Sequence, residues 1–264
     1  MHHNERTLEL ELILAVCALV LIALIFLMLT FIKRKKKIKK VRKGKKYQSI
    51  IDEMTYKIMF DESAKDEVCE TYKSYQDKKF FNKILVKALV SLHRSYVGEP
   101  KTNIEKFYEA SGLCNFSLKK LKSNSWVNNV EAIRDLSKLN YKNAYNDILK
   151  FTCHKRIEVQ KEAIIGVVLL NGINELEKFK DSELYFDDWM QTNFLYSLKI
   201  KQNSIENINL DLFQSKNESF LLLLARIVEL YRIHIHYTTL VESLKTIKKD
   251  KTRTDFETII ARLN

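Results

Sequence analysis

The chain has 264 residues, with 45 Lys or Arg, 33 Asp or Glu and a net charge of +12 at pH 7. Five glycines and one proline are too few for the tight turns of strand-rich folds or the glycine-rich loops of nucleotide-binding α/β folds, so the composition predicts an all-α protein. The charge does not indicate a nucleic-acid binder, because residues 33–46 carry +11 and residues 1–32 carry −2, which leaves +3 for residues 47–264.

Residues 12–32 form an apolar run in which Thr30 is the only residue outside the apolar set. A helix of this length reaches about 30 Å, the thickness of the hydrocarbon core of a bilayer. A signal peptide would have a basic N-terminus, a shorter apolar region and a cleavage site of small residues, whereas here the N-terminal flank is acidic and lysines follow the run. A core helix would show a polar face, and this run has none. The run therefore predicts a single transmembrane helix.

A basic stretch, residues 33–46, follows the run directly, while a single Arg precedes it. The positive-inside rule therefore places residues 1–11 outside and the C-terminal domain in the cytoplasm, at the plasma (inner) membrane. The stretch either only determines this topology or also binds anionic lipid headgroups. Its basic residues are Lys33, Arg34, Lys35, Lys36, Lys37, Lys39, Lys40, Arg42, Lys43, Lys45 and Lys46.

Residues 47–125 are expected to form the helical first part of the cytoplasmic domain. Ser63-x-x-Asp66 and Thr102-x-x-Glu105 have the spacing of capping motifs and predict helix starts. Apolar residues at helical spacing and stop signals predict helices over residues 47–60, 63–75, 78–97 (ended by Gly98-Glu99-Pro100), 102–112 (ended by Gly112) and 117–122.

Residues 126–264 show a helical pattern that repeats. Glu-Ala-Ile occurs at residues 131–133 and again at 162–164, 31 residues apart. The small Ala lets neighbouring helices approach and the apolar flanks fill the groove, as in stacked helix pairs that cannot bury their faces alone. Helices are predicted from Trp126 to Leu136, from Ala144 to Phe151, and over residues 158–170, 184–199, 205–213, 218–231, 236–247 and 254–263, with a charged linker over 245–253.

The segments Trp126-Val-Asn-Asn-Val-Glu-Ala-Ile-Arg-Asp-Leu and Ile157-Glu-Val-Gln-Lys-Glu-Ala-Ile resemble HEAT repeats. Such repeats carry Val-Arg-x-x-Ala in the second helix, and here Gln160 stands where the Arg would join an interhelical ladder. Residues 113–264 also resemble membrane-anchored bacterial HEAT-repeat proteins, on these features: Ser123–Trp126, Asp188-Trp189 and Ser215-Lys-Asn-Glu-Ser219. The resemblance implies an α-solenoid that binds other proteins, with a membrane glycosyltransferase as one associated partner.

An acidic-aromatic cluster precedes one of the predicted helices. It consists of Asp181, Glu183, Tyr185, Phe186, Asp187, Asp188 and Trp189. Paired carboxylates can perform acid/base chemistry or hold Mg²⁺, and they also favour helix N-termini, where the helix dipole is positive. The aromatic residues either pack in the core or form an exposed anchor for a partner. The residues assigned to partner binding are Tyr185, Phe186, Asp187, Asp188 and Trp189.

Two short motifs combine residues that can ligate metals or act as nucleophiles. His234 and His236 would face one side on a strand, but they point about 200° apart on a helix, and their neighbours favour a helix-surface pair. Cys153 and His154 are adjacent in sequence, which rarely gives catalytic geometry, and the basic residues that follow indicate a surface turn. No metal, cofactor or catalytic site is predicted.

These patterns predict an all-α protein with one N-terminal transmembrane helix and a HEAT-like solenoid of stacked antiparallel helix pairs over residues 126–264. We expect a non-enzymatic scaffold that binds a membrane-associated protein, such as a glycosyltransferase or another envelope complex, and contacts lipid. Neither nucleic acid nor a small-molecule substrate is indicated. The alternative is a membrane-bound enzyme or signalling receptor that uses the cluster from Asp181 to Trp189.

Overall fold

The computed structural model describes residues 2–201, 208–233 and 236–263. Throughout these residues the chain is helical or irregular and contains no strand, which confirms the all-α prediction. The chain divides into two compact units, residues 1–54 and residues 55–264.

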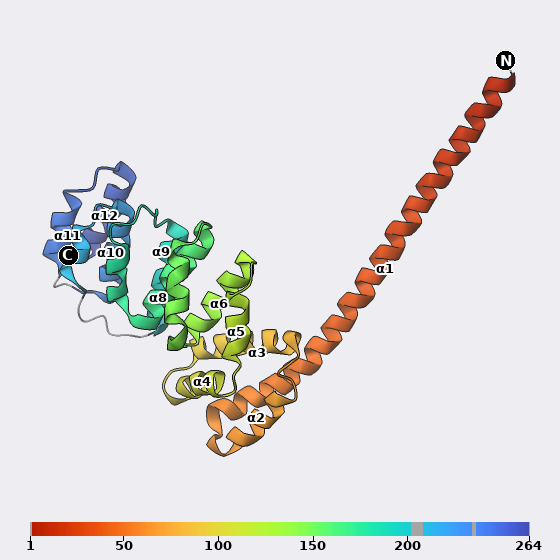
Figure 1. Cartoon of the computed structure of the whole chain (residues 1–264). Coiled ribbons are helices and arrows are strands. Elements are labelled where there is room, and N and C mark those ends of the chain that lie inside the picture. Colours follow the sequence, from red (N-terminus) through yellow and green to blue (C-terminus); the bar gives the residue numbers. More distant parts are fainter. Residues whose placement is uncertain (1, 202–207, 234–235, 264) are drawn as a thin grey trace. The chain divides into compact units, whose positions relative to one another are not determined.

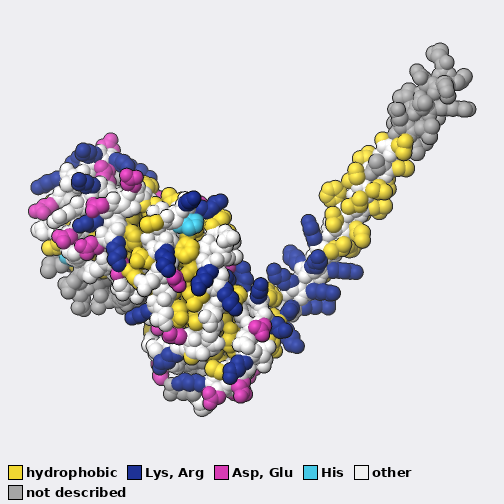
Figure 2. All heavy atoms as spheres, in the orientation of Figure 1, with side chains coloured by type: hydrophobic (Ala, Val, Ile, Leu, Met, Phe, Trp, Pro, Cys, Tyr) yellow, Lys and Arg dark blue, Asp and Glu magenta, His cyan; other side chains and the backbone are white. Residues whose placement is uncertain are grey.

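The first unit is formed by α1, a continuous helix over His2–Phe60 whose last residues belong to the second unit (Figure 1). All large apolar side chains from Leu14 to Ile32 are exposed, and within the described residues α1 is the one helix long and apolar enough to cross a membrane. The helix continues unbroken through residues 33–46, whose basic side chains follow the apolar band in Figure 2. The basic stretch is therefore helical, and its 11 Lys and Arg side chains are exposed.

The second unit is built from helices that pack mainly against elements a few places away along the chain. The strongest contacts join α5 to α6, α6 to α8 and α10 to α12; α8 also contacts α7 and α9, and α3 contacts α4 and α6 (Figure 1). With η for 3₁₀ helices, the elements are η1 (Glu62–Ala64), α2 (Lys65–Lys73), α3 (Lys79–Ser95), α4 (Glu99–Ala110), α5 (Cys114–Leu121), α6 (Trp126–Lys138), η2 (Lys142–Ala144), α7 (Tyr145–Leu149), η3 (Lys150–Cys153), α8 (Ile157–Asn171), η4 (Ile173–Phe179), α9 (Asp188–Lys201), η5 (Leu210–Gln214), α10 (Glu218–Tyr231), α11 (Tyr237–Leu244) and α12 (Asp250–Leu263).

Helix α8 lies in the core of the second unit. Eleven of its 15 residues are buried, and it contacts α6, α7 and α9. A Cβ atom at Gly166 would lie 2.9 Å from Cγ2 of Ile133, so glycine lets α6 and α8 approach closely at this point. Ala132 and Ala163, from the two Glu-Ala-Ile repeats, are both fully buried.

The two predicted capping motifs are wrong. The carboxylate of Asp61 accepts hydrogen bonds from the N–H (3.0 Å) and hydroxyl (2.6 Å) of Ser63, and α2 begins only at Lys65. Thr102 lies inside α4, which begins three residues earlier because Pro100 fixes a helical φ in the first turn. The predicted end at Gly112 is confirmed, since Gly112 follows α4 with a φ of 73°.

Helix boundaries in the repeat region differ from their predictions in several places. The charged linker predicted over 245–253 is wrong in its second part, because α12 begins at Asp250. The predicted helix from Ala144 to Phe151 is broken into η2, α7 and η3. The helix expected to begin at residue 184 begins at Asp188, after residues 182–187, which belong to no helix. The helix expected over 205–213 falls partly outside the described residues, and its end forms η5. Helix α10 has its predicted bounds, with Asn217 as its N-cap.

Candidate functional site

The segment before α9 places the residues assigned to partner binding on different sides of the chain. Residues 182–187 belong to no helix, and buried and exposed residues alternate from 184 to 186. Tyr185 is accordingly 58% exposed, whereas Phe186 is fully buried, and Trp189 in the first turn of α9 is 49% exposed. The segment thus offers two exposed aromatic side chains, Tyr185 and Trp189.

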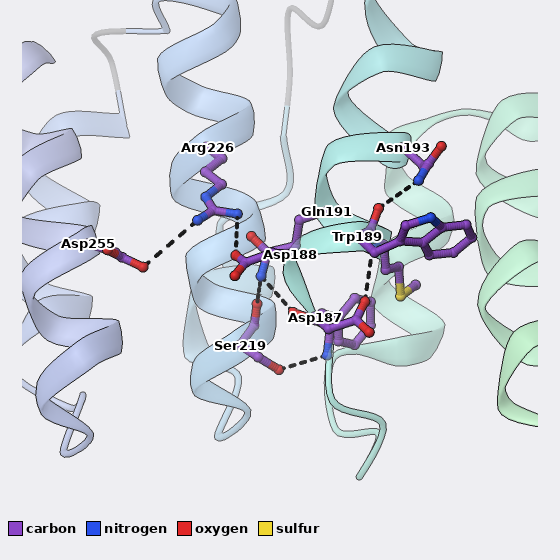
Figure 3. A network of polar contacts seen from close by, with 10 residues as sticks. Asp187, Asp188, Trp189, Gln191, Asn193, Ser219, Arg226 and Asp255 are labelled. Atoms are coloured by element: carbon purple, nitrogen blue, oxygen red, sulfur yellow. Dashed lines mark hydrogen bonds and ion pairs between the residues drawn. The ribbon is translucent and has the colours of Figure 1, made fainter.

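Phe186 does not belong to an exposed binding surface. Its ring packs edge-on against Phe220 of α10, with ring centroids 5.4 Å apart. Its N–H donates to the Ser219 hydroxyl (3.0 Å), and its carbonyl accepts from the side-chain amide of Gln191 (2.6 Å; Figure 3). The expected contact of Phe186 with a partner is therefore corrected: Phe186 anchors the start of α9 to α10.

Asp187 caps α9 and joins it to α8. One carboxylate oxygen accepts the N–H of Met190 (2.9 Å), which is the contact of an N-cap residue, and the other lies 2.5 Å from Nζ of Lys161. Burial raises the pKa of Asp187, but the hydrogen bonds from Lys161 and Met190 outweigh burial and hold this pKa below its ordinary value. The helix-capping interpretation is confirmed for Asp187, which stays ionised to keep α9 in place.

Asp188 points away from Asp187, toward α10 (Figure 3). Its Oδ1 lies 3.1 Å from Nη1 of Arg226, and the other terminal nitrogen of Arg226 lies 3.9 Å from Oδ2 of Asp255 on α12. Asp187 and Asp188 thus make separate structural ion pairs, which gives no support to paired acid/base chemistry. Within the described parts of the chain, no three His, Cys, Asp or Glu side chains are grouped to hold a metal ion.

Exposed large apolar residues also stand at the starts of two earlier helices, and the sequence analysis did not recognise them as a group. Trp126, Ile157 and Trp189 stand at the starts of α6, α8 and α9, at spacings of 31 and 32 residues, and are 37%, 46% and 49% exposed. The guanidinium of Arg156, just before α8, lies 5.1 Å from the centroid of the Trp126 ring. The recurrence of large apolar residues at helix starts was the signal for this group.

The starts of α6, α8 and α9 adjoin one another. Arg156 places the start of α8 beside Trp126, and the Lys161–Asp187 ion pair places the start of α9 beside the first turns of α8. We call the surface formed by Trp126, Val127, Ile157, Tyr185 and Trp189 the N-terminal edge. Aromatic side chains of this kind supply much of the binding energy at protein interfaces.

The helix-surface position predicted for His236 is wrong, and within the described residues neither short motif belongs to a metal-ligand cluster. His236 is buried, its ring centroid lies 5.6 Å from that of Phe213, and burial lowers its pKa; His234 lies outside the described residues. The ring of His154 accepts the N–H of Arg156 (3.0 Å) within a turn, and Cys153 is exposed. The surface turn predicted at Cys153 and His154 is confirmed.

No protein-family model, curated protein or solved structure matches the chain. What this protein does must therefore be argued from the exposed run of α1, the N-terminal edge and the other surfaces of the second unit.

Proposed function

We propose that this chain is a single-pass membrane protein whose helical domain is a non-enzymatic scaffold for a protein partner. The observation that carries the proposal is the exposure of all 14 large apolar side chains between Leu14 and Ile32. Burying one such side chain is favourable by about 1.5–3 kcal/mol, so the run in water would be unfavourable by tens of kcal/mol. The hydroxyl of Thr30, the run's one polar side chain, donates to the Phe26 carbonyl (2.8 Å) and so needs no water.

The basic residues of 33–46, which we call the basic collar, orient the protein in this proposal. All 11 are exposed along a continuous stretch of α1 that is about 21 Å long at 1.5 Å per residue. Each Lys or Arg near an anionic membrane surface gains about 1 kcal/mol. The collar therefore holds residues 47–264 at the cytoplasmic face, with the N-terminus outside.

The arrangement of the domain is, in this proposal, a HEAT-like solenoid. Two features support it: most helix contacts join elements close together along the chain, and the Glu of each Glu-Ala-Ile repeat pairs with a cation of an earlier helix. Nζ of Lys120 lies 3.3 Å from Oε2 of Glu131, and Nη2 of Arg134 lies 2.6 Å from Oε2 of Glu162. These pairs form an interhelical ladder without the Arg that Gln160 replaces. The short pieces η2, α7 and η3 make the intervening helix irregular.

The N-terminal edge is the proposed docking surface for the partner. It presents two Trp and one Tyr beside apolar residues, and Lys249 lies 5.7 Å from the centroid of the Tyr185 ring. Anchoring at a membrane raises the effective concentration of a membrane-associated partner without new contacts. The HEAT resemblance suggests a membrane glycosyltransferase or another envelope complex as that partner.

Replacing Trp126 and Trp189 by Ala tests the docking surface. We expect photo-crosslinkers placed at Val127 and Tyr185 of the full chain in native membranes to capture a single stoichiometric membrane protein. The double variant should lose this partner in detergent pull-downs while keeping the melting temperature within a few degrees, because both side chains are partly exposed.

The matched control replaces Leu210, an equally exposed apolar residue on η5, by Ala. Leu210→Ala should retain the partner in full. If both variants retain it, or if crosslinks at the N-terminal edge reach only chaperones, this edge is not the docking surface.

A further inference from the structure

A second surface of the domain has a different chemistry. A cavity of about 460 Å³ lies among α3, α4, α6, α8 and α9, within the range of roughly 300–1,000 Å³ that small-molecule sites occupy. Apolar atoms of Val90, Leu169 and Tyr196 form part of its wall, and serine and threonine hydroxyls form another part. The cavity is separate from the N-terminal edge, since none of its lining residues belongs to that edge.

Four cationic side chains line this cavity: Lys87 and Arg94 from α3, Lys101 from α4 and Lys138 from α6. Other cations of the domain, such as Lys120 and Lys161, have a carboxylate within 3.3 Å. Of the ion pairs and hydrogen bonds found in the described part of the chain, by contrast, none involves these four side chains. Lys87 and Arg94 are exposed and Lys101 and Lys138 are half-buried, so water screens part of their mutual repulsion, and an anion between them would relieve the rest.

The one carboxylate in the cavity wall, Glu105, is already occupied. Its Oε1 lies 2.7 Å from Nε2 of His93, and its Oε2 accepts from the side-chain amide of Asn140 (3.0 Å). Burial raises the pKa of Glu105, but these hydrogen bonds, together with the nearby charge of Lys101, outweigh burial and keep the pKa below its ordinary value, so Glu105 carries one negative charge at pH 7. With the one carboxylate of Glu105 and four cationic side chains in its wall, the cavity has an excess of about three positive charges.

Lys138 is the most clearly desolvated of the four cations. It is half-buried, and burial lowers its pKa, with Glu162 and Asp135 opposing this effect and Arg134 and Arg94 adding to it. Glu162, the carboxylate that raises the pKa of Lys138 most, already forms an ion pair with Arg134 at 2.6 Å. A half-buried lysine without an ion-pair partner of its own is partly desolvated, and an anionic ligand bound beside it would offset this cost.

We propose that this cavity binds a small phosphorylated organic molecule. The phosphate would lie among Arg94, Lys101 and Lys138, because a guanidinium can hold two phosphate oxygens in parallel and lysines add point charges. The cavity is larger than a bare phosphate ion needs, and its apolar wall with the exposed ring of Tyr196 suits an organic body, such as a base, a sugar or a lipid headgroup with its glycerol. This ligand site goes beyond the scaffold function and does not depend on it.

Titration of the full chain in a neutral detergent tests the site. The probes are ATP, fructose 1,6-bisphosphate and inorganic pyrophosphate as soluble phosphates, and short-chain phosphatidylinositol 4-phosphate with its free headgroup as the lipid arm. We expect at least one probe to bind with a Kd well below about 1 mM at physiological salt. Stronger binding of ATP or the bisphosphate would assign a soluble ligand, and stronger binding of the lipid would assign a headgroup.

The site variant is Arg94→Gln with Lys101→Gln, two changes outside the core. The matched control is Lys106→Gln with Lys142→Gln, which removes the same charge from exposed positions away from the cavity. We expect the site variant to weaken binding at least about tenfold and the control to weaken it less than twofold. Equal losses in both variants would mean diffuse attraction, including to the basic collar, and would overturn the proposal.

A third variant, Lys138→Met, separates a ligand site from a structural role. If Lys138 serves the ligand, this variant loses binding yet raises the melting temperature of the unliganded protein, because an unpaired half-buried charge is removed. A lower melting temperature, or binding of no probe by the wild type below about 1 mM, would overturn the proposal.

Discussion

Two helices of this protein are apolar on nearly every side, yet they have opposite surroundings. The run of α1 from Leu14 to Ile32 exposes every large side chain, whereas α8 buries 11 of its 15 residues among α6, α7 and α9. Neither shows the wide polar face of a surface helix. Apolar composition therefore predicts that a helix leaves water, but the neighbouring helices and flanking charges decide whether it enters a protein core or a bilayer.

The polar residues of the two helices show the same difference. The run of α1 contains one hydroxyl, which is satisfied inside the helix by the Phe26 carbonyl. Helix α8 contains Lys161 and Glu162, both buried, and each finds a charged partner on another element, Asp187 and Arg134 respectively. A core helix can carry charges because neighbours pair with them, whereas a lipid-facing run has no such neighbours.

The largest expected effect is loss of membrane insertion when lysines enter α1. Fourteen large apolar residues contribute roughly −4 to −8 kcal/mol on an insertion scale, and each Lys near the centre costs about 3 kcal/mol. Ile25→Lys alone should stay membrane-integral, while Leu21→Lys, Ile25→Lys and Met28→Lys together should not. Carbonate extraction of membranes measures this. Release of the single variant would mean that the run is only peripherally bound.

The same substitution in α8 should act on the fold instead of on location. Ile164 is fully buried, so Ile164→Lys places an unpaired charge in the core and should cost more than about 4 kcal/mol of unfolding free energy. Ile25→Lys should leave the melting temperature of the domain unchanged, which makes it the control. Thermal denaturation of the full chain in detergent measures both, and a stable Ile164→Lys variant would contradict the core position of α8.

Asp187→Ala should have the next largest effect, because it removes a helix cap worth about 0.5–2 kcal/mol and leaves buried Lys161 without a partner. We expect a loss of about 2–3 kcal/mol. Asp187→Asn keeps the capping hydrogen bond and should lose only the stability that the ion pair with Lys161 contributes. Asp188→Asn should change stability by less than about 0.5 kcal/mol, since its carboxylate is largely exposed.

The pH dependence of this effect follows from the lowered pKa of Asp187. The folded protein holds the carboxylate ionised, so its contribution is complete above the ordinary Asp pKa of 3.8 and is lost as the pH falls through the lower folded value. The stability difference between wild type and Asp187→Asn should therefore be constant from pH 5 to 7 and shrink below about pH 4. A difference that grows on acidification would contradict the assigned ion pair.

The sequence predicted long helices well because their apolar periodicity is local. Helices α3, α6, α8 and α10 lie where their patterns placed them, and Gly112 ends α4. Caps were harder, because Asp61 and Pro100 compete with Ser63 and Thr102 within a few residues. Such local competition is decided by geometry that a spacing motif does not contain.

The two sites of the domain were predictable to different degrees. Tyr185 and Trp189 were found because they lie together in sequence, but the burial of Phe186 depends on where α9 starts. The cavity was invisible, because Lys87 and Ser197 are 110 residues apart and meet only through the packing of five helices. Burial and pairing of charges are tertiary properties, and these properties distinguish Lys138 from the other lysines.

The smallest expected change in stability concerns the contact between α6 and α8 at Gly166. In an isolated helix Gly→Ala stabilises by about 1 kcal/mol, but a Cβ at position 166 would lie 2.9 Å from Cγ2 of Ile133, on a fully buried and β-branched side chain that cannot move aside. Overpacking costs about 1–3 kcal/mol, so Gly166→Ala should destabilise by about 1 kcal/mol in net terms. Ile133→Val, which shortens the other arm of the side chain but keeps Cγ2, should not restore the loss, whereas Ile133→Ala should make the alanine at 166 favourable. A double-mutant cycle in chemical denaturation measures this coupling, and additive effects would show that α6 and α8 do not meet at Gly166.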